Sequence, residues 1–106
     1  MATDWAADIK KYAPDADDAV IAKLLSTYRL ALGDRDSAFV ALSDPDEVAT
    51  LRKNFLRGKL GLDQDDAILD AAIKDVALQM KADRTKSRAT VYYLLADKFD
   101  KLDMFR

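Results

Sequence analysis

The 106-residue sequence contains no cysteine and no histidine. Without cysteine, the chain can form no disulfide, no thiolate metal site and no cysteine nucleophile. Without histidine, it lacks the commonest general base and the commonest metal ligand in proteins. These two absences exclude many of the familiar catalytic and metal-binding classes.

Glycine and proline are scarce, at three and two residues, while half of the chain is apolar and 34% is charged. This balance is typical of a globular, helical protein. The beginning, "MATDWAADIKKY", carries acids and no long apolar stretch, so it does not resemble a signal peptide. The longest apolar run, "VYYLLA", is far too short to cross a membrane. We therefore expect a soluble cytoplasmic protein with no membrane contact.

Capping residues mark where several helices should begin. After a short amphipathic helix stopped by Pro14, Asp15 offers an N-cap for a helix that runs to about Leu32. The strongest local signal is "SDPDEV", where Asp44 is placed to cap a helix and Pro45 suits its first position. Asp63 offers the cap of the next helix. Each of these starts is followed by apolar residues at helical spacing.

The last helix is expected from about Ser87, and its sequence is apolar on nearly all sides. A helix of this kind usually lies at the centre of a bundle. The sequence therefore predicts an all-α fold, a compact bundle of five to six helices that forms one domain over residues 1–106.

The segment "DRDSAFVALS" has an apolar core that fits either a short helix or a lone strand. No second convincing strand is available to pair with it. We therefore favour a short helix for this part of residues 33–43.

The acidic clusters of the chain could suggest a metal site, but each one lies at an expected helix start. Negative charge there is favourable because it offsets the helix dipole. The cluster around Asp63 and Asp65 lacks the glycine and the final glutamate of a calcium loop. No phosphate-binding glycine loop or nucleophile motif occurs either. We expect no metal, no cofactor and no catalytic residues.

Positive charge is concentrated between residues 81 and 88, where four cations accompany the single acid Asp83. Lys81 and Arg84 suit the negative end of the preceding helix. Lys86 and Arg88, in contrast, flank the start of the last helix, the end that is already positive. Something negative is expected to lie beside them.

Two interpretations follow. In the first, the negative group is an acid from elsewhere in the fold, and the turns at residues 15–18 and 63–66 and the terminal carboxylate are the favoured sources. In the second, it is a phosphate-bearing ligand, held by backbone N–H groups and cationic or hydroxyl side chains. The candidate anion-binding residues are Arg84, Lys86, Ser87, Arg88 and Thr90. Nucleic acid is a special case of the second interpretation, since Tyr92 and Tyr93 lie close by, although helical spacing places Tyr92 towards the core.

Three stretches together carry a resemblance to a known family: "DWAADIKKYAPDAD", "SDPDEVATLRKNFLRGKLGL" and "DRTKSRATVYYLLADKFDKLDMF". They resemble the small bacterial family called domain of unknown function 2853, over nearly the whole chain. The resemblance implies a bacterial, stand-alone, cytoplasmic protein. It implies no activity, cofactor or catalytic residue.

These observations favour a non-enzymatic binding or interaction module. The first alternative is a binder of phosphate ligands or nucleic acid that uses residues 84–90; the second is a cryptic enzyme built from Tyr, Lys and Asp. A protein partner is equally compatible with the sequence, and so is a homodimer, although no heptad seam indicates one.

Overall fold

The helices of the N-terminal part begin at acidic caps, as expected, but not all at the expected ones. The computed structural model describes residues 4–106. Helix α1 (Trp5–Tyr12) is capped by Asp4, which accepts a hydrogen bond from the N–H of Ala7 at 2.9 Å. Helix α2 (Asp18–Thr27) is capped by Asp17, so the assignment of Asp15 as the cap was wrong. Either residue is an aspartate near the turn, and only the path of the backbone decides between them.

The expected continuous helix to Leu32 is interrupted at Tyr28. This residue leaves helical geometry (φ −107°, ψ 22°), and the short helix α3 (Arg29–Leu32) follows. The Tyr28 ring packs edge-on against the rings of Phe55 and Tyr92, with centroids 6.2 and 4.7 Å away. The interruption therefore coincides with a packing contact between distant parts of the chain.

The prediction of a short helix within residues 33–43 was wrong. The segment forms turns and then a two-residue strand, β1 (Phe39–Val40), which pairs antiparallel with β2 (Lys86–Ser87). The partner strand is polar and only two residues long, so the sequence contains no pattern that would reveal it. The amide of Arg88 also donates to the carbonyl of Ala38, which extends the contact by one bond.

The start at "SDPDEV" is confirmed. Helix α4 (Pro45–Leu51) has Pro45 in its first turn, and the Asp44 carboxylate accepts from the N–H of Asp46 at 2.9 Å. The chain then continues as the π-helix η1 (Arg52–Lys59). Gly61 closes the segment with φ of 68°, a left-handed conformation that costs glycine little.

Helix α5 (Asp66–Gln79) begins after Asp65, so Asp63 is not its cap, and the side chain of Asp65 makes no capping hydrogen bond. Helix α6 (Arg88–Lys98) begins directly after Ser87, as predicted, and the short 3-10 helix η2 (Leu102–Phe105) ends the fold. Within residues 4–106, none of the helices is both long enough and apolar enough to span a bilayer.

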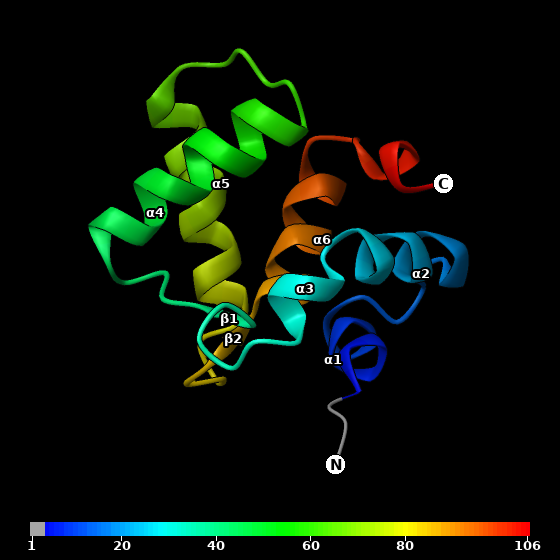
Figure 1. Cartoon of the computed structure of the whole chain (residues 1–106). Helices are drawn as coiled ribbons and strands as arrows, with labels where there is room; N and C mark the ends of the chain where they lie inside the picture. Colours follow the sequence, from blue (N-terminus) through cyan, green and yellow to red (C-terminus); the bar gives the residue numbers. More distant parts are fainter. Residues whose placement is uncertain (1–3) are drawn as a thin grey trace.

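Helix α6 occupies the centre of the molecule, with α5 on one side and α1 and α2 on the other (Figure 1). All its residues from Ala89 to Ala96 are buried. The ring of Tyr92 stacks on that of Phe55 with centroids 3.8 Å apart and planes 10° from parallel. The all-α fold class is confirmed, with the two-residue strands as a small addition to a helical bundle.

Candidate anion-binding site

The side chains of Ser87 and Thr90, at the start of α6, form hydrogen bonds within the fold. Ser87 caps the helix by accepting from the N–H of Thr90 at 3.4 Å, and the Thr90 hydroxyl donates to the carboxylate of Asp8 in α1. Ser87 and Thr90 are 4% and 0% exposed. An acid therefore does lie beside the positive end of α6, where the helix dipole favours it. It is Asp8, and not a residue of the 15–18 or 63–66 turns or the terminal carboxylate, as the sequence had suggested.

Arg88 also bonds within the fold, but to neutral acceptors. Its Nε donates to the carbonyl of Ser37, and its Nη1 donates to the hydroxyl of Tyr92 at 2.6 Å. The guanidinium carbon lies 5.4 Å from the centroid of the Tyr92 ring. Arg88 thus joins the segment before β1 to α6. Its charge is partly buried, and no carboxylate among residues 4–106 forms an ion pair with it.

Asp83, the one acid of the basic segment, is held by α1. Its carboxylate accepts from the Tyr12 hydroxyl at 2.6 Å and from Lys11 Nζ at 3.0 Å. The Tyr12 hydrogen bond, followed by that of Lys11, lowers the pKa of Asp83 below its ordinary value of 3.8. Lys11 also lies 3.7 Å from Asp8, so the two acids share one lysine. The carboxylate of Asp83 is therefore directed towards α1, although its charge also acts on Lys86, which helps to lower the pKa of Asp83.

The remaining cations of the segment converge on a pocket of about 300 Å³. Its walls are residues 40–43, Ala77 and the three cationic side chains of Lys81, Arg84 and Lys86. Lys86 Nζ donates to the backbone carbonyl of Asp83 at 2.8 Å, a neutral acceptor that orients the side chain. The end of α5 and the β1–β2 pair, which form this pocket, lie at the same end of the molecule (Figure 1).

No carboxylate lines this basic pocket, and no ion pair within residues 4–106 involves Lys81, Arg84 or Lys86. The walls include two lysines, one arginine and Ser43, and these residue types carry the donors that proteins offer to phosphate oxygens. The arrangement can hold a compact anion by charge and hydrogen bonding.

The five residues predicted to form an anion site thus separate into two groups. Arg84 and Lys86 line the pocket, whereas Ser87, Arg88 and Thr90 use their polar side-chain groups inside the fold. Whether an anion binds stays a prediction.

The sequence interpretation missed Lys81 and Ser43 as pocket residues. Lys81 had been assigned to the helix end alone, although its place in the same charge run was a usable signal. Ser43 carried no signal, because only the β1–β2 pairing brings residues 40–43 to the basic segment.

Comparison with known proteins gives a family and no activity. No curated protein matches the sequence. A match to a family covers residues 4–103, nearly the whole chain, and includes both the basic segment and α6. The chain belongs to the family described as protein of unknown function (DUF2853).

Proposed function

We propose that the protein is a non-enzymatic binding module whose ligand is a phosphate-bearing anion held in the basic pocket. The observation that supports this function is the convergence of Lys81, Arg84 and Lys86 on one pocket with no acidic side chain among its walls. The proposal takes residues 1–106 as one domain, in a bacterial cytoplasmic protein, as composition and family resemblance predict.

Electrostatics favours such a ligand. Three like charges around one concave surface repel one another, and a bound dianion relieves that repulsion while it gains charge-assisted hydrogen bonds. The protein carries a formal charge of −2, so this concentration of cations is local and does not follow from an excess of lysine and arginine. Lys81 and Arg84 are exposed, and Lys86 is half-buried. Because water and salt screen exposed charges, binding should weaken as ionic strength rises.

A phosphate group alone fits the pocket better than a strand of nucleic acid does. Binders of single-stranded nucleic acid supply exposed aromatic rings on which bases stack. Tyr92 and Tyr93, the rings nearest in sequence, are 6% and 4% exposed and pack in the core. A short RNA is therefore expected to bind through its phosphates only.

An amide-resolved NMR titration with inorganic phosphate, a mononucleotide and a short RNA tests the proposal. We expect saturable shifts at Ser43, Lys81, Arg84 and Lys86 that weaken with added salt. The double change Arg84→Ala and Lys86→Ala should reduce affinity by about tenfold or more, since each removes a charged hydrogen-bond donor. Lys53→Ala is the matched control, because Lys53 is an exposed lysine outside the pocket.

The proposal fails if none of the three probes shifts these amides, or if the double variant binds as well as the Lys53→Ala control. Shifts that do not depend on salt would also contradict it, since they would indicate contacts other than charge.

A further inference from the structure

The single acid of the basic segment, Asp83, is close to the basic pocket but is directed away from it. Lys81, Arg84 and Lys86, its neighbours in the chain, line the pocket, whereas Asp83 does not. The Asp83 amide donates to the carbonyl of Met80 at 2.9 Å, so its backbone is bonded to the end of α5. The acid is therefore kept out of a pocket that its own neighbours form.

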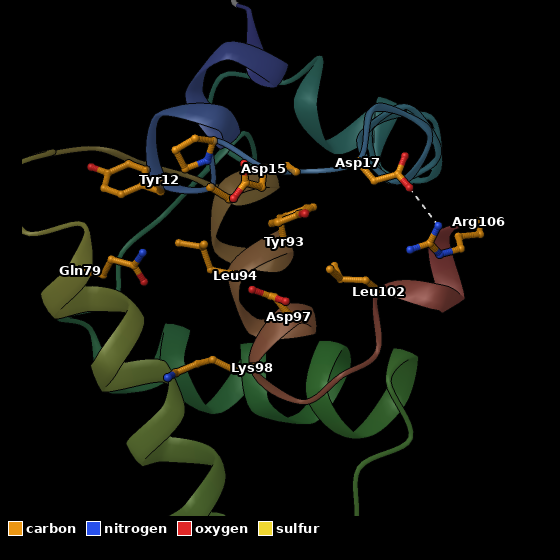
Figure 2. Close-up of a pocket in the computed structure, with 13 residues that line it drawn as sticks. Tyr12, Asp15, Asp17, Gln79, Tyr93, Leu94, Asp97, Lys98, Leu102 and Arg106 are labelled. Atoms are coloured by element: carbon orange, nitrogen blue, oxygen red, sulfur yellow. Dashed lines mark hydrogen bonds and ion pairs between the residues drawn. The ribbon is translucent and has the colours of Figure 1, made fainter.

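Two side chains at the end of α1, Lys11 and Tyr12, hold the carboxylate of Asp83, and we call them the α1 clamp. Lys11 Nζ lies 3.1 and 3.0 Å from the two carboxylate oxygens, and the Tyr12 hydroxyl donates to one of them at 2.6 Å. Figure 2 shows Tyr12 at the edge of a second cavity, of about 430 Å³, with its hydroxyl directed away from Tyr93 and Asp97. This hydroxyl therefore serves the basic segment and not that cavity.

A cation of the basic pocket lies within reach of the same carboxylate. Lys86 Nζ donates to the backbone carbonyl of Asp83 at 2.8 Å, so the ammonium group is beside this residue. The hydrogen bonds of Tyr12 and Lys11 lower the pKa of Asp83 most, and the charge of Lys86 lowers it further. If the clamp released the carboxylate, rotation of the Asp83 side chain would be enough to bring it to Lys86, where it would accept a charge-assisted hydrogen bond.

A released carboxylate would compete with a bound anion. It offers the same kind of acceptor oxygen as phosphate, and its attachment to the same segment gives it an effective concentration on the order of millimolar. Pairing with Lys86 would also reduce the repulsion among the three cations, which is the force that favours an anion in the pocket. The clamp therefore removes a competitor that the chain itself carries.

We propose that Lys11 and Tyr12 determine the anion affinity of the basic pocket, because they keep the Asp83 carboxylate from occupying it. They are positioning residues, since neither lines the pocket. The inference rests on the proposed function and adds to it that α1 sets the strength of binding from 71 and 72 positions away in the sequence.

Titration of variants with inorganic phosphate, followed by amide NMR, tests the inference. The double change Lys11→Met and Tyr12→Phe removes the clamp contacts and should weaken phosphate binding by about tenfold, the effect of one charged hydrogen bond. Adding Asp83→Asn should restore the wild-type affinity, because an amide carries no charge with which to compete. Lys53→Met is the control for the loss of one cation, since Lys53 is exposed and outside the pocket.

Tyr12→Phe alone changes no charge, so it separates release of the carboxylate from a general loss of positive potential. It removes one hydrogen bond and should weaken phosphate binding by about threefold. These variants should fold, because Lys11 is exposed and Tyr12 is only half-buried, and their amide spectra verify it.

The ammonium group of Lys86 reports on the carboxylate without any ligand. Its NMR signal should shift in the double clamp variant and should return when Asp83→Asn is added. This measurement separates the two proposals. If phosphate shifts no amide of the wild-type protein, the proposed function fails, while the Lys86 signal still decides whether the clamp restrains Asp83.

Three results would overturn the inference. The first is a double clamp variant that binds phosphate as tightly as the Lys53→Met control. The second is an affinity that stays low after Asp83→Asn is added, since the clamp would then shape the segment without restraining a competitor. The third is a Lys86 ammonium signal that the clamp substitutions leave unchanged.

Discussion

At the scale of single residues, neighbours four positions apart in one basic run have different roles. Arg84 is exposed at the basic pocket, while Arg88 lies between Ser37 and Tyr92 and donates to both. Both are arginines in the same run of cations, so their neighbours in the sequence give little indication that one is exposed and the other is bonded within the fold. The difference arises because Arg88 begins α6, so its side chain is directed over the buried Tyr92 one turn later.

Replacing Arg88 by alanine should lower the free energy of unfolding by about 2 kcal/mol, since it leaves the Ser37 carbonyl and the Tyr92 hydroxyl without their donor. Arg84→Ala should change it by no more than about 0.5 kcal/mol, as is usual for exposed positions. Urea denaturation followed by circular dichroism measures both. If the two variants prove equally stable, the contacts of Arg88 do not stabilise the fold and its charge is available for a ligand instead.

At the scale of elements, acids cluster at the starts of helices, but only some of them cap. Asp44 accepts a hydrogen bond from the backbone of its own helix, whereas Asp65, at the equivalent position of α5, does not. The first residue of α4 could be predicted because the proline after Asp44 favours the extended conformation that a cap needs. The start of α5 has several aspartates and no proline, so composition alone could not indicate the first helical residue.

Asp44→Ala should therefore destabilise the protein by about 1 kcal/mol, the usual value of an N-cap hydrogen bond. Asp65→Ala should cost about 0.3 kcal/mol, because it loses only the favourable charge near the helix dipole. Chemical denaturation of the two variants under one set of conditions compares them directly. Equal losses would mean that charge, and not the hydrogen bond, stabilises the start of α4.

At the scale of the whole molecule, α6 connects the parts of the fold. Its buried residues contact α1, α2 and α5, and its first turn is bonded to Asp8 and to the segment before β1. The central position was predictable, since the sequence of α6 is apolar on nearly every side. Substitutions there should affect the entire bundle, while those at its surface should not.

Two leucines test this contrast. Leu95 in α6 is 0% exposed and Leu30 in α3 is 84% exposed. Leu95→Ala should cost about 3 kcal/mol, from lost burial and the cavity left behind, and should lower the melting temperature by about 12–20 °C. Leu30→Ala should shift the melting temperature by no more than about 3 °C. Thermal unfolding by circular dichroism measures both, and similar shifts would show that α6 is not the centre of stability.

Much of the architecture was determined by the sequence itself. The all-helical class, the cap at Asp44, the start of α6 after Ser87 and the burial of that helix all depend on short-range physics: backbone restriction by proline, N-cap hydrogen bonds and the spacing of apolar residues. Each of these effects acts between residues that are only a few positions apart in the sequence. The sequence also located the basic segment, since a run of like charges is visible without any fold.

The tertiary structure decided what the polar groups of that segment do. Three contacts join residues about 50 to 80 positions apart: the pairing of β1 with β2, the hydrogen bond of Thr90 to Asp8 at the start of α6, and the ion pair of Asp83 with Lys11. The basic pocket also depends on tertiary structure, because the pairing of β1 with β2 brings residues 40–43 to Lys81, Arg84 and Lys86. Such contacts depend on side-chain geometry across the whole bundle, and many pairings of the abundant acids and bases are almost equal in energy until the backbone is in place.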